Sequence, residues 1–122
     1  LSRPPIFTPS VGRYYKGMIV EVPLALQALP EPAPLARVHE VLARAYDGAQ
    51  FIEVLSLEAC AALKTLDPEG LNDTNKLRLH VFGHDGEARL VALLDNLGKG
   101  ASGAAVQNLN LVLGVDEGEG LG

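Results

Sequence analysis

Residues 95–114 read Asp-Asn-Leu-Gly-Lys-Gly-Ala-Ser-Gly-Ala-Ala-Val-Gln-Asn-Leu-Asn-Leu-Val-Leu-Gly, and this stretch says most about the chain. A strand pattern over 89–94 runs into a turn of very small residues, which opens a helix pattern near Ala101 that ends at Gly114. The first backbone N–H groups of a helix have no partner within the helix, so such a start suits a phosphate or a carboxylate. The same glycines also fit a purely structural interpretation, a turn that lets the helix pack closely on the strand.

The glycines at 98, 100 and 103 match the string Gly-x-Gly-x-x-Gly of dinucleotide-binding folds. That fingerprint also requires a second strand after the helix and an acidic residue about 20 positions further on. Here Glu117 and Glu119 lie in a Gly-rich tail, and residues 115–122 are expected to be disordered. The sequence therefore predicts no complete Rossmann unit, and only the helix start remains as a candidate ligand contact.

Apolar periodicity outside this stretch alternates between strand and helix patterns. Pro23 indicates that its strand is an edge or ends early, and residues 83–86 are typical of a hairpin turn. The expected elements are strands over 6–8 and 18–26, a helix over 35–46, a strand over 51–55, a short helix over 57–66, strands over 77–82 and 89–94, and the last helix. This order predicts an α+β fold in which helices pack on one face of a mixed, largely antiparallel sheet.

Composition limits the class of protein. The 122 residues fit one domain, 48% of them are apolar, and no apolar run reaches 18 residues, so we expect no membrane span. The net charge of −5 argues against a nucleic-acid partner. One cysteine excludes an internal disulfide and, with no visible signal peptide, favours the cytoplasm. Because Leu1 is not a start methionine and the first residues resemble mid-domain sequence, we expect a fragment of a longer protein.

Two segments carry side chains suited to binding. Arg13 and Lys16, with two tyrosines between them on a Gly-flanked turn, could bind an anionic substrate, and a solvated surface loop is an equally weighted alternative. The amides of Asn96, Gln107 and Asn108 lie beside or inside the last helix, where they could bind a carboxamide such as that of nicotinamide. Ordinary helix faces carry such amides too.

The remaining nucleophilic and titratable side chains give weak signals. Cys60 lies among alanines without a cation nearby, so we expect a core residue and not a thiolate nucleophile. His39, His80 and His84 share no metal-ligand spacing, and we expect His39 on the solvated side of its helix.

Two separated segments together resemble the shorter form of the N-acetyl-gamma-glutamyl-phosphate reductase family. The first is PIFTPSVGRYYKGMIV over 5–20, and the second is 77–114, with DNLGKGASG over 95–103 and AVQN over 105–108. The resemblance implies an NADP-dependent enzyme of arginine biosynthesis that reduces N-acetylglutamyl phosphate to the semialdehyde through a cysteine thioester, with a histidine as acid and base. It also implies a homo-oligomer built on a Rossmann domain and a sheet-rich domain, with a C-terminal helix that returns to the cofactor.

On this resemblance, residues 1–95 are part of the catalytic and dimerisation domain, and 96–114 are the turn and helix that return to the cofactor domain. The residues implied at the substrate are Arg13 and Lys16; those implied at NADP are Asn96, Lys99, Gly100, Ala101, Ser102, Gly103 and Asn108. The Rossmann domain, the cysteine and the histidine are expected upstream of Leu1, so the isolated chain should be inactive. Two alternatives stay open: the C-terminal domain of aspartate-semialdehyde dehydrogenase, which has a similar Asp-Asn-Leu…Lys-Gly-Ala stretch, and a non-catalytic dimerisation domain.

Overall fold

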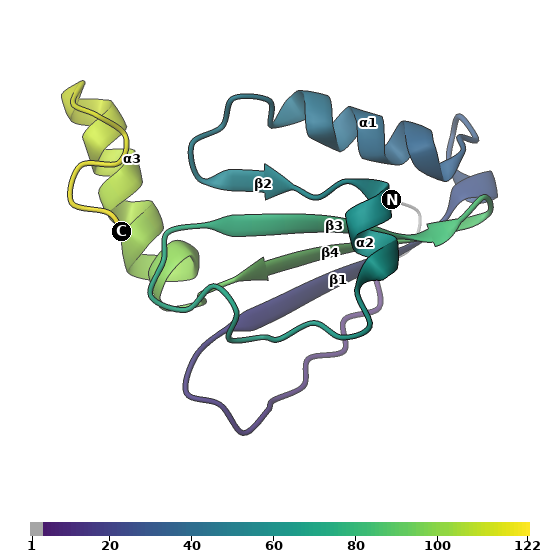
Figure 1. The fold of residues 1–122 in the computed structure, drawn as a ribbon, viewed down its shortest axis with the longest axis horizontal. Helices are drawn as coiled ribbons and strands as arrows, with labels where there is room; N and C mark the ends of the chain where they lie inside the picture. The colour runs from purple at the N-terminus through teal and green to yellow at the C-terminus, as the bar shows by residue number, and fades with distance from the viewer. Residues whose placement is uncertain (1–3) are drawn as a thin grey trace.

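The computed structural model describes residues 4–122 and shows one four-stranded sheet with three α-helices (Figure 1). In chain order the elements are β1 (Met18–Ala25), the short 3-10 helix η1 (Leu26–Ala28), α1 (Leu35–Ala45), β2 (Ile52–Val54), α2 (Leu57–Ala62), β3 (Leu77–His84), β4 (Glu87–Leu94), the π-helical turn η2 (Gly98–Ser102) and α3 (Gly103–Leu113). Local chemistry explains several boundaries. The hydroxyl of Ser56 accepts a hydrogen bond from the N–H of Ala59 at 3.1 Å and caps α2, and Gly114 ends α3 with a φ of 69°.

The strands lie in the order β1-β4-β3-β2. β4 is antiparallel to both of its neighbours, so that Leu90 faces Val22 on one side and Val81 on the other. β2 runs parallel to β3 at the far edge. The expected α+β class with a mixed, largely antiparallel sheet is therefore confirmed.

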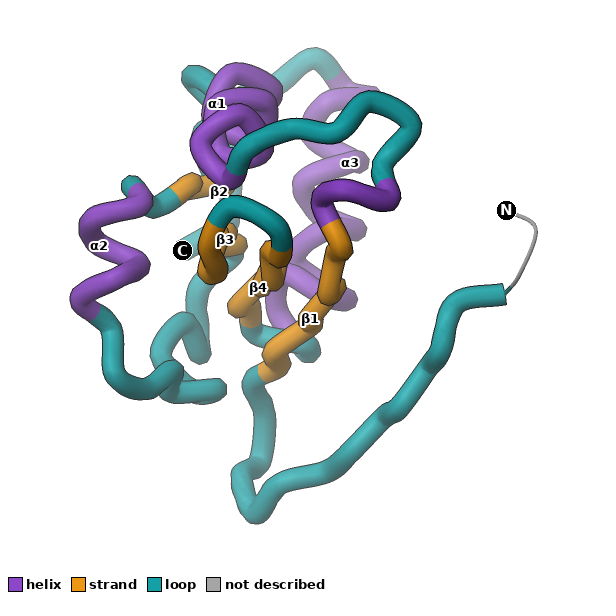
Figure 2. Tube along the Cα trace, turned by 90° about the vertical axis from the view of Figure 1, so that its right-hand side faces the viewer, coloured by secondary structure: helices purple, strands orange, loops and turns teal. Residues whose placement is uncertain are grey.

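The placement of the helices differs from the expected packing on one face of the sheet. Both α1 and α2 contact β3, and in Figure 2 α2 lies to one side of the sheet whereas α1 lies above β2. The connection through α1 crosses the sheet from β1 to β2, and the connection through α2 returns from β2 to β3. Because right-handed crossovers that run in opposite directions place their helices on opposite faces, the two helices divide between the two sides.

The core lies around the middle of β3 and β4. Val81, Val91, Leu26 and Cys60 are each only 1% exposed, which confirms Cys60 as a core residue. The side chains of β1 are much less covered: Val20 and Val22 remain 45% and 47% exposed. They share one face of the sheet with Ala92 and Leu90 of β4, so this face presents a largely apolar surface to solvent.

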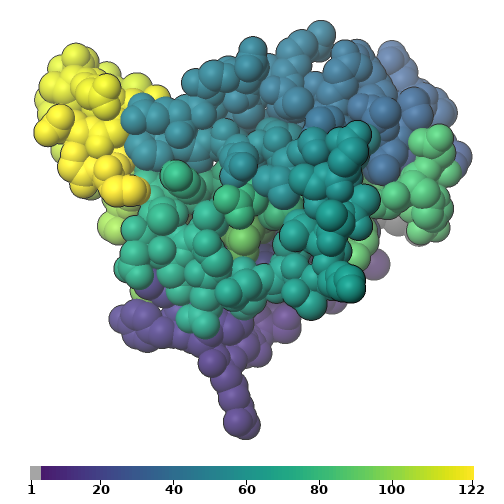
Figure 3. All heavy atoms as spheres, in the orientation of Figure 1, coloured from purple at the N-terminus to yellow at the C-terminus, as the bar shows by residue number. Residues whose placement is uncertain are grey.

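Two terminal segments differ from the sequence expectations. Residues 6–8 form no strand, and Figure 3 shows the N-terminal segment projecting from the body. Residues 115–122, expected to be disordered, instead fold back on α3. The cause is the buried Asn110, whose Nδ2 donates to the carbonyl oxygens of Glu117 at 3.1 Å and Glu119 at 2.9 Å. The N–H of Asn75 also donates to the carbonyl of Gly122 at 2.9 Å.

Candidate functional site

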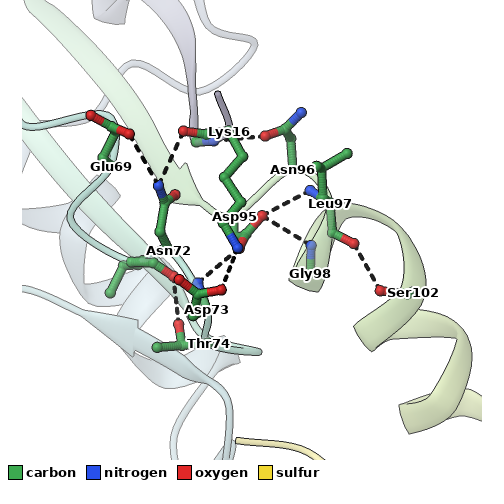
Figure 4. Close-up of polar contacts among 12 residues, drawn as sticks. Lys16, Glu69, Asn72, Asp73, Thr74, Asp95, Asn96, Leu97, Gly98 and Ser102 are labelled. Atoms are coloured by element: carbon green, nitrogen blue, oxygen red, sulfur yellow. Dashed lines mark hydrogen bonds and ion pairs between the residues drawn. The ribbon is translucent and has the colours of Figure 1, made fainter. Parts of the chain in front are cut away.

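A polar cluster forms where the loop before β1, the loop before β3 and the end of β4 meet (Figure 4). These segments are far apart in sequence, and the antiparallel pairing of Met18 with Leu94 brings the first and last of them together. The cluster borders a hollow of about 330 Å³. Its polar lining includes Lys16, Asp73, Asn75, Asp95 and Ser102.

Asp95 is the centre of the cluster and is 1% exposed. Its Oδ1 accepts hydrogen bonds from the N–H groups of Leu97 at 2.9 Å and Gly98 at 3.0 Å. Its Oδ2 accepts from the N–H of Asp73 at 2.8 Å and lies 3.2 Å from the ammonium of Lys16. One carboxylate therefore connects three separate segments of the chain.

Asp95 and Lys16 are both ionised at neutral pH. Burial by itself would raise the pKa of Asp95, but the N–H groups of Gly98, Asp73 and Leu97 and the Lys16 ammonium outweigh it and lower the pKa to about 2. The pKa of Lys16 is raised, chiefly by its hydrogen bond to Asp73, although partial burial opposes the shift. Asp95 is thus a carboxylate and Lys16 an ammonium across the physiological range.

The start of the last helix differs from the expected free anion site. The N–H groups of Leu97 and Gly98 are occupied by the Asp95 carboxylate, and the N–H of Gly100 donates to the Asp95 carbonyl at 2.9 Å. The N–H of Ser102 donates to the carbonyl of Leu97 at 3.2 Å within the π-helical turn. The prediction of unpaired donors is wrong for these four positions, because the chain supplies its own carboxylate and carbonyl acceptors.

Asn96 is committed to a structural contact with the loop before β1. Its Oδ1 accepts a hydrogen bond from the N–H of Gly17 at 2.7 Å. Gly17 is buried with a φ of 112°, and a Cβ there would lie 2.2 Å from the carbonyl oxygen of Pro68. Only glycine fits this position without a shift of backbone.

The other predicted cofactor residues divide into two groups. Lys99 faces inward: its Nζ contacts Gln107 Oε1 at 2.5 Å and lies 5.6 Å from the centre of the Phe51 ring, and burial lowers its pKa. Gly103 is also buried, with a Cβ position that would lie 2.2 Å from Asn75 Oδ1. The exposed group consists of Gly100, Ala101, Ser102 and Asn108.

The two predicted substrate residues are in different environments. Lys16 is paired with Asp73 and Asp95, so its charge is already balanced. Arg13 is exposed and forms no hydrogen bond or ion pair within residues 4–122. Of the two, only Lys16 lines the hollow beside Asp95.

Sequence reasoning missed Asp95 and Asn110, the two buried side chains that organise this end of the fold. A signal for Asp95 was present, because aspartate followed by a helix start often accepts the N–H groups two and three positions on. No comparable local signal marked Asn110, whose partners lie in the tail. His39, expected to be solvated, lies with its Nε2 2.8 Å from the carbonyl oxygen of Leu55.

Residues 4–122 contain neither a cluster of metal-binding side chains nor a helix suited to a membrane. No group of three or more His, Cys, Asp or Glu side chains is arranged there to hold a metal ion. None of the helices in that range is long and apolar enough to cross a bilayer.

Comparison with known proteins gives one family and a consistent set of relatives. The family model described as "Semialdehyde dehydrogenase, dimerisation domain" matches residues 2–96. N-acetyl-gamma-glutamyl-phosphate reductase of Brucella anthropi is 57% identical over 116 residues, which are 93% of this chain and 37% of that protein. The enzymes of the same name from Brucella ovis and Brucella abortus are 55% identical with the same coverage. The chain thus spans 37% of the length of these relatives and corresponds to their C-terminal part.

Proposed function

The chain belongs to the semialdehyde dehydrogenase family through its dimerisation domain, and from this premise we propose that it serves an N-acetyl-gamma-glutamyl-phosphate reductase. The proposed reaction is the NADPH-dependent reduction of N-acetylglutamyl phosphate to the semialdehyde in arginine biosynthesis, in the cytoplasm. The identity of 57% over 93% of the chain carries this proposal. It favours this reaction over that of aspartate-semialdehyde dehydrogenase, which has a similar Asp-Asn-Leu…Lys-Gly-Ala stretch.

We propose a division of the catalytic roles between this chain and a preceding segment of the enzyme. NADPH would supply the hydride, and the nucleophilic cysteine and the acid–base histidine are proposed to lie on a preceding segment together with the Rossmann domain. Cys60 is buried in the core and is not a candidate nucleophile. We propose that residues 1–95 form part of the catalytic and dimerisation domain and that 96–114 approach the cofactor domain.

The isolated chain should show no reductase turnover, whereas a chimera in which it replaces the matching segment of the Brucella anthropi relative should be active. The reason is that the one cysteine of the chain, Cys60, is buried, whereas the sequence matches the domain that would complete the enzyme. The measurement is NADP reduction with N-acetylglutamate semialdehyde and phosphate. A correctly folded chimera without turnover would contradict the proposed function, and turnover by the isolated chain would contradict the division of the catalytic roles.

The cofactor contact is proposed on the exposed side of the turn and of α3, at Gly100, Ala101, Ser102 and Asn108. Asn96, Lys99 and Gly103 would support this surface from inside through the contacts described above. A Cβ on Gly100 would point toward Leu94 and the Asp95 carbonyl, at 3.3 and 3.4 Å. A substitution at Gly100 therefore tests packing, and Asn108 is the better probe of cofactor binding.

Two amides on the same helix give a matched pair for that test. Asn108→Ala in the chimera should raise the KM for NADPH about fivefold, the equivalent of one hydrogen bond, without changing the unfolding midpoint. Asn110→Ala should do the reverse, lowering stability by about 1–2 kcal/mol because the tail loses two hydrogen bonds, with the KM unchanged. Steady-state kinetics and urea denaturation measure both effects. An unchanged KM for Asn108→Ala would remove this residue from the proposed site.

Arg13 is the proposed ligand of the anionic substrate. Its guanidinium is free of carboxylate partners within residues 4–122 and can offer two parallel hydrogen bonds to a carboxylate or phosphate. Lys16 was the second proposed ligand. Because Lys16 is paired with two carboxylates, we propose that it does not bind the substrate itself and instead supports the loop that carries Arg13.

The dimer is proposed to form through the apolar face that β1 and β4 expose. Val20→Glu combined with Val22→Glu places two charges on that face and should convert the associated chain to a monomer. Glu21→Gln, one residue away on the opposite face, is the matched control and should leave association unchanged. Sedimentation equilibrium measures the association state of each variant. A wild-type chain that stays monomeric at high concentration would contradict this assignment of the interface.

A further inference from the structure

Two neighbouring side chains tie the loop before β1 to the turn before α3. Asp95 contacts the ammonium of Lys16 at 3.2 Å, and Asn96 accepts the N–H of Gly17 at 2.7 Å. The same Asp95 carboxylate holds the N–H groups of Leu97 and Gly98. Figure 4 shows the contacts from Lys16, Leu97 and Gly98 converging on the Asp95 carboxylate, with the contact of Asn96 beside them.

The two carboxylates around Lys16 differ in their surroundings. The side chain of Asp73 is 83% exposed, so water screens its pairing with Lys16. Asp95 is 1% exposed, and its position is fixed by three backbone N–H groups. Asp95 is therefore the fixed point and Lys16 the group that is held. The amide of Asn72 adds a contact to the Lys16 carbonyl at 3.2 Å, which holds the backbone but carries no charge.

We propose that Asp95 is a positioning residue of the reductase, one that sets the substrate-side loop and the cofactor-side turn in a fixed relation. Through Lys16 it orients residues 13–17, and through Leu97 and Gly98 it orients residues 97–103. The inference rests on the proposed function, because it takes Arg13 to face the substrate and the exposed turn to face NADPH. We call these contacts of Asp95 with Lys16, Leu97 and Gly98 the tether. Small displacements of groups that orient reactants slow catalysis, so loss of the tether should change the kinetic constants.

The test uses the chimera and two substitutions. One removes only the contact between Lys16 and Asp95, and the other weakens the contacts of Asp95 on both sides. Lys16→Met removes the link to the substrate loop and should raise the KM for the semialdehyde about tenfold, with the KM for NADP within about twofold. Asp95→Asn weakens the contact with Lys16 and the contacts with the turn before α3, and should raise both KM values about tenfold or more. Lys16→Arg keeps the charge, so its KM for the semialdehyde should stay within about threefold of the wild-type value. Lys76→Met and Asp47→Asn are exposed controls of matched charge that should change neither constant.

A purely structural role predicts a different pattern, in which both KM values stay unchanged and the maximal rate falls in proportion to the folded fraction measured by circular dichroism. That pattern, or a failure of Lys16→Arg to keep the KM for the semialdehyde near the wild-type value, would overturn the inference. If the unmutated chimera has no turnover, the proposed function fails and hydrogen exchange of the same proteins tests the tether. Asp95→Asn should then speed exchange in both 13–17 and 97–103, and Lys16→Met only in 13–17. Faster exchange in only one segment for Asp95→Asn would overturn the tether as well.

Discussion

Asp95→Ala should lower the free energy of unfolding of the chain by about 3–4 kcal/mol, the largest effect of any polar substitution described here. The substitution leaves the N–H groups of Leu97, Gly98 and Asp73 without their acceptor and removes the buried partner of Lys16. Because these losses share one site, they do not add fully. Urea denaturation at pH 7 measures the change, and Asp47→Ala on an exposed turn should stay within about 0.5 kcal/mol of wild type. A loss below about 1 kcal/mol would show that water replaces the carboxylate.

The same residue gives an acid dependence with a definite sign. The pKa of Asp95 is lowered from 3.8 to about 2 in the folded chain, so folding favours the carboxylate. Its contribution to stability is fully present above the unfolded pKa and disappears as the pH falls through the folded pKa. The stability difference between wild type and Asp95→Asn should therefore be constant from about pH 7 to pH 5 and shrink toward pH 2. A difference that does not change over this range would contradict the assigned ionisation.

Gly17→Ala should cost about 3 kcal/mol or more, because it combines backbone strain with a steric conflict. Gly17 has a φ of 112°, and its new Cβ would lie 2.2 Å from the carbonyl oxygen of Pro68. Backbone on both sides would have to move, which would also disturb the hydrogen bond from Gly17 to Asn96.

A second glycine separates the two causes. Gly48 has a φ of 74°, but no atom lies within 4 Å of its Cβ position, so Gly48→Ala should cost only about 1 kcal/mol of conformational strain. Urea denaturation of both variants under the same conditions makes the comparison. Equal losses for the two variants would show that the loop before β1 yields to the added methyl group.

Periodicity predicted most of the fold, because regular elements bury one face and leave a repeating pattern. The helix expected over 35–46 is α1, and the hairpin turn expected over 83–86 is present at 85–86, where it joins β3 to β4. The expected strand over 6–8 is absent, since a short apolar run without a pairing partner gains too little to form. The order of strands could not be deduced, because nothing local says that β1 pairs with β4 and not with β2.

The candidate site was predicted less completely, for a physical reason. The Gly-rich turn and Lys16 do lie together, but the helix-start donors were assigned to a ligand when Asp95 already occupies them. Which acceptor reaches a given N–H depends on side-chain geometry within a turn, and a residue pattern does not specify that geometry. The tail was expected to be disordered for a similar reason: its composition is polar and flexible, whereas the contact that orders it comes from Asn110 on another element.

A ribosome that makes this chain releases β1 long before the strand it pairs with. β1 ends at Ala25, and its partner β4 begins at Glu87 and is complete only at Leu94. During synthesis of the intervening residues, the apolar side chains of β1 cannot yet pair with β4, and the nascent segment is open to chaperones or to other unfinished chains. The β3–β4 hairpin closes over a few residues, whereas the addition of β1 must close a long loop, so we expect the pairing of β1 to be slower than that of the hairpin. Of the four strands in residues 4–122, β1 is thus synthesised first, and we expect it to join the sheet last.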